Sequence, residues 1–261
     1  MSVPCPQCGF ALPSDARRCP TCGRPAGDHA VPAARPDRSA RPLQGLTVAV
    51  AVTLSAWCAV ELFSAAVSLT RVFLINSLLD GEEPSQDALD VNDGLYALSG
   101  LMQLCALLAC AVVFVVWLFR ARANAEALSP LMHRHGRPWF VFGWILPIAN
   151  FFIPKRFVDD IWLASRPGTP ATDWRGQRHP GLVRLWWAFY LLYFYAPQLA
   201  ERALGLRSDD PGVMRTIALV EVAAAPFGVA AAVLAIATVR RITAFQELRR
   251  TAPVAEARLA P

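Results

Sequence analysis

Four long apolar segments constrain this 261-residue chain more than any other feature of its sequence. They cover about residues 46–69, 95–119, 182–204 and 213–239. At 1.5 Å of rise per residue, a helix over each one is long enough to cross a hydrocarbon core of about 30 Å. The composition agrees, with 55% hydrophobic residues, 17% charged residues and a mean hydropathy of +0.36. We therefore predict an all-α integral membrane protein with four transmembrane helices.

The charges between these segments predict which side of the membrane each loop faces. The loop from 80 to 93 contains six acidic residues and no Lys or Arg, whereas the loop from 120 to 137 contains four arginines and one acid. Basic loops tend to stay in the cytosol. We therefore expect the acidic loop outside, the arginine-rich loop inside, and both termini on the cytoplasmic side of the cell membrane.

A fifth apolar segment, at residues 138–154, is broken by Gly143, Pro147 and Asn150. Proline lacks a backbone N–H, so a lipid-exposed helix here would leave carbonyl groups unpaired. If this segment crossed the membrane, the later arginine-rich loops would lie outside, against the positive-inside rule. We predict that residues 138–165 form a re-entrant or interfacial segment that does not span, and Trp139, Trp144 and Trp162 favour a position near the headgroups.

The end of this segment has the pattern of an amphipathic helix that begins near Pro154. One face carries apolar residues, and the other carries two pairs of opposite charge at i,i+4 spacing: Lys155 with Asp159, and Arg156 with Asp160. Two interpretations stay open. The pairs are solvated on a structural interfacial helix, or Lys155, Arg156 and Asn150 form a contact site for a lipid headgroup or a ligand.

The N-terminus contains two copies of a CPxCG motif. Cys5, Cys8, Cys19 and Cys22 follow the pattern C-x2-C-x10-C-x2-C, which supplies the four thiolates of a tetrahedral zinc site. The alternative is a pair of disulfides, but flanking arginines favour the reducing cytosol. We predict a zinc ribbon over residues 1–25 and a flexible linker rich in Pro, Ala and Arg over 26–44.

Two stretches of the chain carry a family resemblance. WLFRARANAEAL, at residues 117–128, and PWFVFGWILPIANFFIPKRFVDDIWLAS, which begins at Pro138, resemble the bacterial membrane family called domain of unknown function 4328. The residues that carry the motif are Arg120, Asn124, Trp144, Pro147, Asn150, Pro154, Asp160 and Trp162. The resemblance implies a membrane domain over roughly residues 45–245, with a zinc ribbon as a common attachment, and it implies no catalytic residue.

We predict a disordered tail over residues 246–261.

Three polar residues lie at a similar depth inside the predicted spans. Glu61, Gln103 and Glu221 each lie about eight residues from the outer end of a span, which corresponds to a depth of ~12 Å. We expect them at one level, where they are able to form a single cluster. This cluster is either a neutral packing contact or a site that responds to protons or cations. Ser64 and Ser68 are expected to serve close helix packing.

Several function classes are disfavoured by the sequence. It lacks the H-E-x-x-H, G-x-S-x-G and glycine-rich phosphate-binding motifs, so we do not expect an enzyme. The ribbon has few aromatic or basic neighbours, so we expect the lipid bilayer and a cytosolic protein, rather than nucleic acid, as partners. The primary hypothesis is a regulatory, scaffolding or sensing membrane protein. The alternative is a small transporter or channel that uses Glu61, Gln103 and Glu221.

Overall fold

A computed structural model describes residues 3–4, 11–12, 41–128, 136, 138–167, 180–203 and 210–251. The chain divides into two compact units, Met1–Arg38 with Ala252–Pro261, and Ser39–Thr251. In the first unit, strands β1 (Val3–Pro4) and β2 (Ala11–Leu12) pair in antiparallel fashion and flank the first CPxCG motif in the sequence. The predicted zinc ligands Cys5, Cys8, Cys19 and Cys22 lie outside the described residues, so the zinc ribbon stays a prediction.

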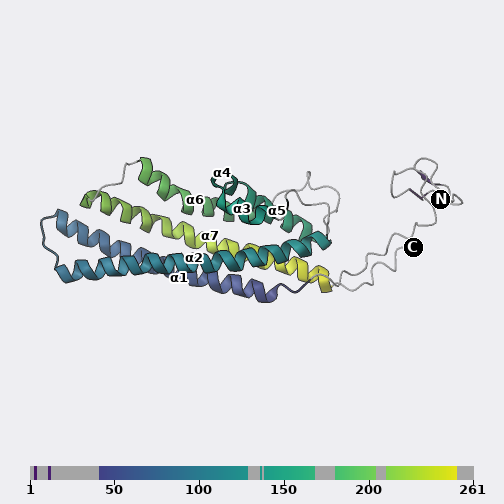
Figure 1. The fold of residues 1–261 in the computed structure, drawn as a ribbon, viewed down its shortest axis with the longest axis horizontal. Coiled ribbons are helices and arrows are strands. Elements are labelled where there is room, and N and C mark those ends of the chain that lie inside the picture. The colour runs from purple at the N-terminus through teal and green to yellow at the C-terminus, as the bar shows by residue number, and fades with distance from the viewer. Residues whose placement is uncertain are drawn as a thin grey trace. The chain divides into compact units, whose positions relative to one another are not determined.

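The second unit consists of seven helices in its described residues (Figure 1). They are α1 (Gln44–Leu79), α2 (Gln86–Leu128), α3 (Trp139–Ile145), α4 (Pro147–Asn150), α5 (Ile153–Ser165), α6 (Gly181–Ala203) and α7 (Pro211–Thr251). The predicted all-α class is therefore confirmed for the membrane domain.

Three of these helices, α1, α2 and α7, are long and apolar enough to cross a membrane. The pair formed by α3 and α5 qualifies only if its two bent halves count as one span. The predicted third span corresponds to α6, which is not in this group; Arg184, Glu201 and Arg202 make its ends more polar. The structure agrees with a multi-pass membrane protein, and the count of four spans stays a prediction.

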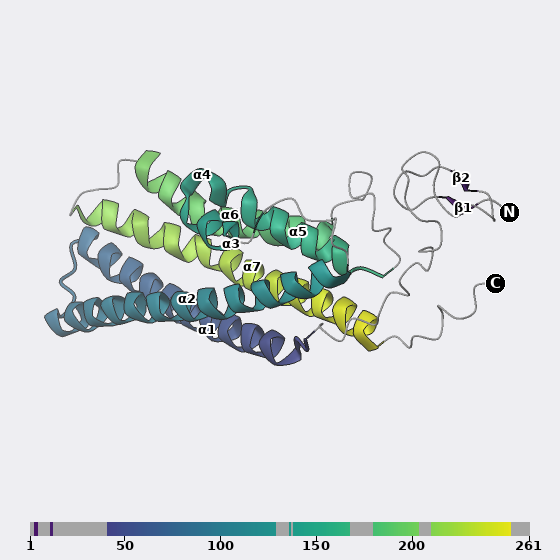
Figure 2. The same ribbon diagram turned by 45° about the vertical axis from the view of Figure 1, so that its right-hand side comes forward.

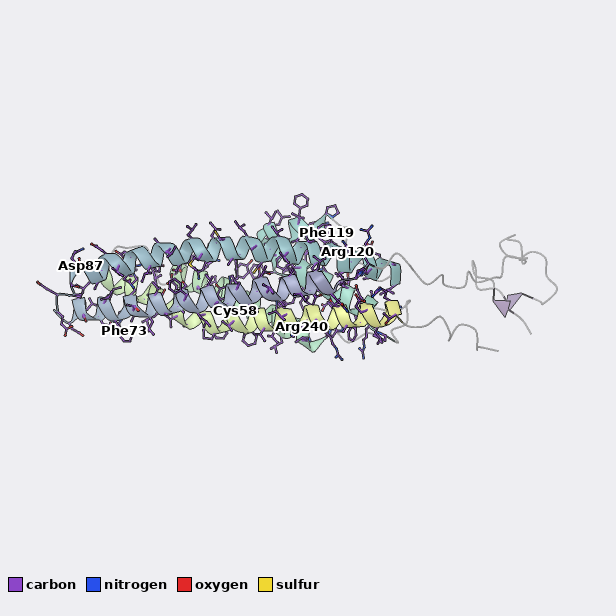
Figure 3. All side chains as sticks on the ribbon, turned by 90° about the horizontal axis from the view of Figure 1, so that it is seen from below. Cys58, Phe73, Asp87, Phe119, Arg120 and Arg240 are labelled. Atoms are coloured by element: carbon purple, nitrogen blue, oxygen red, sulfur yellow. The ribbon has the colours of Figure 1, made fainter. Side chains whose placement is uncertain are left out.

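The four long helices run side by side (Figures 1 and 2), and their contacts give the order α2, α1, α7, α6. Helix α1 packs along both α2 and α7, and α6 packs along the other side of α7, whereas α2 and α6 are not packed along each other. Figure 3 places Asp87 near one end of the bundle, and Arg120 and Arg240 toward the other. Asp87 of the acidic loop and Arg120, where the arginine-rich loop begins, therefore lie toward opposite ends, as the charge pattern predicts.

The broken segment enters and leaves at the arginine-rich end of the bundle. Near its start, the Phe140 ring packs against Phe119 at a centroid distance of 5.3 Å, and near its end the carbonyl of Ala164 accepts a hydrogen bond from Arg249. Its two main helices are bent by 109°. A bend of this size fits either a broken span or a re-entrant segment, and the contacts at one end of the bundle favour the second.

Helix α5 differs from the predicted interfacial helix in one respect. Lys155 does pair with Asp159 at 2.6 Å, but Asp159 is only 1% exposed and Asp160 only 3%. The prediction of solvated ion pairs is therefore wrong for both carboxylates. The reason is that α5 packs against α2, α6 and α7 together, so that most of its surface is covered.

The boundaries of the membrane domain are also wider than predicted. Residues 246–251 belong to α7 instead of a disordered tail, and residues 41–43 at the end of the predicted linker pack against the helices. Leu43 is fully buried and Gln246 is 3% exposed. Burial of these two side chains holds both ends of the domain in place. A boundary predicted from composition alone does not take such contacts into account.

Candidate functional site

Polar residues recur at helical spacing on the facing sides of α1 and α2. Helix α1 presents Glu61, Ser64 and Ser68, and α2 presents Tyr96, Ser99 and Gln103. Residues three and four apart share one face of a helix. Together with Tyr193 of α6 and Glu221 of α7, these six residues form a set that we call the polar ladder.

The first level of the ladder is built around Glu61, which is 5% exposed. The Gln103 side-chain amide donates a hydrogen bond to Glu61 Oε2 at 3.0 Å, and the Tyr193 hydroxyl donates to the same oxygen at 3.0 Å. The structure thus brings Glu61 and Gln103 together, as expected. Tyr193, which the sequence did not single out, is their third member.

The second level is built around Glu221. The Ser68 hydroxyl donates to its Oε2 at 2.7 Å, and the Tyr96 hydroxyl donates to its Oε1 at 2.7 Å. Ser68 follows Glu61 by seven residues, which is about 10 Å along a helix. The prediction of one common depth is therefore wrong for Glu221, which lies two turns nearer the acidic end.

A pair of serines lies between these two levels. Ser64 and Ser99 approach with 3.4 Å between their hydroxyl oxygens. Ser64 and Ser68 were expected to serve packing alone, yet both take part in hydrogen bonds. The ladder therefore runs without an apolar gap from Glu61 toward the acidic end of the bundle.

All residues of the polar ladder except Ser68 line a cavity of about 680 Å³. Side chains of α1, α2, α3, α6 and α7 surround this cavity, and most of them are apolar or aromatic. Glu61 and Glu221 are the charged residues of the lining, which contains no Lys or Arg. A hydrophobic chamber with a few convergent polar groups is the usual form of a small-molecule site.

Aromatic side chains close the cavity toward the arginine-rich end. Phe114, Trp144, Trp186 and Tyr190 form this aromatic floor. The Trp144 ring stands edge-on to Phe114 at 5.9 Å and to Tyr190 at 6.0 Å, and Phe114 lies 6.1 Å from Trp186. Trp144, which the sequence places near the headgroups, thus packs between α2 and α6 and joins the re-entrant segment to the cavity.

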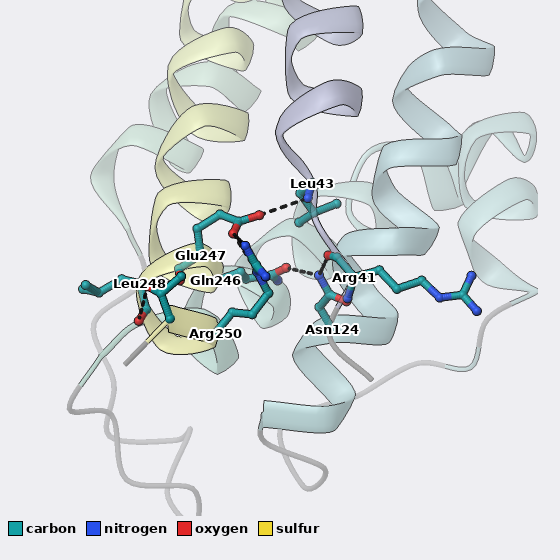
Figure 4. A network of polar contacts seen from close by, with 8 residues as sticks. Arg41, Leu43, Asn124, Gln246, Glu247, Leu248 and Arg250 are labelled. Carbon is teal, nitrogen blue, oxygen red and sulfur yellow. Dashed lines mark hydrogen bonds and ion pairs between the residues drawn. The ribbon is translucent and has the colours of Figure 1, made fainter. Parts of the chain in front are cut away.

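Asn124, a residue of the family motif, organises a polar network at the arginine-rich end (Figure 4). Its side chain exchanges two hydrogen bonds with the Arg41 backbone, at 3.1 and 2.9 Å, and donates to Gln246 at 3.0 Å. Gln246 in turn donates to the carbonyl of Ala121 and to the Ser165 hydroxyl. This network ties α2, α5 and α7 to the chain that leads into α1.

Arg249 adds a second tie at the same end. It donates to the carbonyl of Ala164 at 2.8 Å and to that of Leu128 at 3.5 Å. These carbonyls belong to the C-terminal ends of α5 and α2, where a positive charge is favourable. Burial lowers the pKa of the Arg249 guanidinium from its ordinary value, because the charged form loses contact with water.

The remaining motif residues position the re-entrant segment. Pro147 begins α4, Pro154 is buried in the first turn of α5, and Trp162 stands edge-on to Phe245 at 5.3 Å. Arg120 is half-buried on α2, and Asp160 is buried. Motif residues therefore serve mainly to seat α5 among its neighbours.

The three residues of the predicted headgroup site have different surroundings. Arg156 is exposed, Lys155 is engaged with Asp159, and Asn150 is buried, with its Oδ1 accepting no hydrogen bond from the described residues. Within the described part of the chain, no three His, Cys, Asp or Glu side chains lie close enough to hold a metal ion.

Long apolar helices around a largely apolar cavity are consistent with a multi-pass helical membrane protein. A family model described as "Domain of unknown function (DUF4328)" matches residues 80–244, and the chain belongs to that family. The match begins after α1 and includes both motif stretches. Comparisons with curated proteins and with solved structures gave no match.

Proposed function

We propose that this protein is a membrane sensor that binds a small hydrophobic molecule from the bilayer. The observation that carries the proposal is the cavity of about 680 Å³ beside the polar ladder. Its volume lies within the usual range for small-molecule sites, about 300 to 1,000 Å³. Its apolar lining favours a hydrophobic body, and the ladder supplies a place for one polar group.

The arrangement of the helices supports access from the side. Helices α2 and α6 stand at the two edges of the bundle, and the cavity lies between them. Several lining side chains along this gap are exposed, among them Leu104, Ile145 and Phe194. Apolar side chains exposed at membrane depth contact lipid, so a hydrophobic molecule has a direct path from the bilayer.

The aromatic floor weighs against the alternative of a channel. A pore needs a continuous polar path. Between the ladder and the arginine-rich end, however, the rings of Phe114, Trp144 and Trp186 pack together. Beyond them, Trp117 and Val158 are buried. A chamber with a closed cytosolic side suits binding and sensing better than conduction.

The zinc ribbon completes the proposed role. We propose that both termini are cytoplasmic, that Cys5, Cys8, Cys19 and Cys22 bind one zinc ion, and that the ribbon docks a cytosolic protein. The antiparallel pairing of β1 with β2 on either side of the first cysteine pair supports a ribbon. Deletion of residues 1–38, which keeps the contacts of Arg41 and Leu43 with the helices, should remove the partner and leave ligand binding intact.

Cavity binding is tested with the neutral fluorescent probe N-phenyl-1-naphthylamine and purified protein in lipid nanodiscs. Trp57, Trp144 and Trp186 line the cavity, so a probe inside it receives their excitation energy. Gly100→Leu should fill the chamber, because Gly100 lines it and a Cβ atom added there would meet no atom within 4 Å. Gly94→Leu on the same helix is the matched control, since it also meets none and lies outside the lining.

We expect saturable energy transfer in the wild type and in Gly94→Leu, and its loss in Gly100→Leu. Transfer that rises linearly with probe concentration in all three proteins, as in empty nanodiscs, would show partition into lipid only. That result would reject the cavity as a binding site.

A further inference from the structure

The charge balance of the cavity bears on which class of ligand it accepts. The proposed function leaves this class open, and the inference here rests on that function. The lining contains two carboxylic acids, Glu61 and Glu221, and no basic residue. Near the ladder, the Arg71 guanidinium stacks over the Tyr96 ring at 4.4 Å and pairs with Asp93 at 2.9 Å. The chamber therefore has acidic groups and no internal cation to balance them.

The two carboxylates differ in how many of their oxygens are engaged. Both oxygens of Glu221 accept hydrogen bonds, one from Tyr96 and one from Ser68. Both bonds to Glu61 end on Oε2, and Oε1 accepts no hydrogen bond from the described residues. Glu61 is thus the carboxylate with an oxygen left for a ligand.

The rings around Glu61 favour positive charge as well. Tyr193 donates to Glu61, and Trp57 stands edge-on to the Tyr193 ring at 5.4 Å, so one aromatic ring adjoins the carboxylate and a second packs against it. Tyr190 and Trp144 line the same chamber. The faces of aromatic rings carry partial negative charge, which attracts cations and repels anions.

We propose that the cavity ligand is a hydrophobic cation, such as an alkyl or aryl amine or a quaternary onium ion, whose charge lies against Glu61. The apolar and aromatic walls hold its hydrophobic body. It enters from the bilayer through the gap between α2 and α6. An unpaired carboxylate is costly inside a membrane, and a cationic ligand removes that cost by pairing with it.

The test compares two ions of the same tetraphenyl shape and opposite charge, tetraphenylphosphonium and tetraphenylborate. Each is titrated against full-length protein in nanodiscs of zwitterionic lipid that contain N-phenyl-1-naphthylamine, with empty nanodiscs as the blank. Binding of radiolabelled tetraphenylphosphonium is also measured directly. The variants are Glu61→Gln, which keeps the shape of the side chain, and Asp87→Asn, which removes one exposed carboxylate outside the lining.

We expect tetraphenylphosphonium to displace the neutral probe from wild type and from Asp87→Asn, with tetraphenylborate far weaker. Glu61→Gln should weaken tetraphenylphosphonium binding by at least about tenfold. It should still bind the neutral probe, which shows that the variant is folded and its cavity is intact.

Two failures are distinguishable. If the neutral probe binds the cavity but both ions displace it equally, or if Glu61→Gln binds the cation as tightly as wild type, the cation inference is wrong and the proposed function stands. If the wild type binds neither the neutral probe nor the phosphonium ion in a saturable way, both the proposed function and the cation inference are wrong.

Discussion

Glu61 and Glu221 are the same residue type in similar apolar surroundings, yet their carboxylates have different partners. The sequence predicts that both lie inside the membrane and that Gln103 is near, because depth follows from counting residues along each span. It does not predict the two levels, because these depend on the rotation and offset of α7 against α1 and α2. Tyr96 and Ser99 precede Gln103 at helical spacing, and this pattern was the available sign that α2 presents a polar face.

Asn124 is the motif residue whose loss should be most damaging to the fold. It is 4% exposed and forms three hydrogen bonds with Arg41 and Gln246. Asn124→Ala removes the partner of the buried Gln246 amide oxygen and of the Arg41 backbone groups, and we expect a loss of about 1 to 3 kcal/mol of unfolding free energy. Reversible unfolding in mixed detergent micelles measures it.

Gln86→Ala is the control for Asn124→Ala, because the exposed Gln86 side chain bonds only to its neighbour Asp90. This substitution should change the unfolding free energy by no more than about 0.5 kcal/mol. Equal effects of the two substitutions would refute the structural role given to Asn124.

The four N-terminal cysteines predict one zinc ion per chain. Elemental analysis of purified protein should find this ratio, and Cys19→Ser should abolish it because a structural site needs all four thiolates. Cys58→Ser, in α1, should leave the zinc content unchanged. Protein that contains no zinc and no titratable ribbon thiols would instead support the two-disulfide alternative.

Among the helices, residues 138–165 show which structural features the sequence pattern predicts and which it does not. Prolines and the charges of neighbouring loops predict that residues 138–165 turn back, and the contacts of Phe140 and Ala164 at one end of the bundle agree. The amphipathic pattern of α5 suggested a solvated face. Packing against three other helices covers that face, and local periodicity carries no information on such long-range contacts.

The approach of α7 to its neighbours depends on Gly228. A Cβ atom at this position would lie 2.7 Å from the Tyr193 ring and 2.8 Å from the Trp57 ring. Gly228→Ala should therefore force α7 away from α1 and α6 and cost about 1 to 3 kcal/mol. The unfolding free energy, or the apparent melting temperature in one detergent, is the readout.

Gly100→Ala is the matched control for Gly228→Ala, since a Cβ atom at Gly100 meets nothing within 4 Å. Alanine is the better helix former, so this variant should be neutral or more stable by up to about 1 kcal/mol. A Gly228→Ala protein as stable as Gly100→Ala would contradict the close packing described for α7.

For the whole molecule, the sequence predicts the helical membrane class and the segregation of charge between its two ends. It does not predict the chamber. The cavity lies between α2 and α6 because α6 packs on α7 and does not pack along α2. Helix order follows from contacts between distant segments, such as Trp57 with Tyr193 and Phe114 with Trp186. Patterns within one segment do not encode them.

The topology is tested by labelling intact cells with a membrane-impermeant thiol reagent. Pro170→Cys, in the loop between α5 and α6, should resist the reagent because we expect that loop in the cytosol. Gln86→Cys, at the start of α2, should react. Strong labelling at position 170 would mean that residues 138–165 cross the membrane.

The central claim is that the chamber beside Glu61 holds a molecule drawn from the membrane. Native mass spectrometry of protein released from cell membranes in mild detergent tests this claim most directly. We predict a bound small-molecule mass on wild-type protein and on Gly94→Leu, and its absence from Gly100→Leu, in which the added side chain occupies the chamber. The same bound mass on all three proteins, or none on any of them, would contradict the claim.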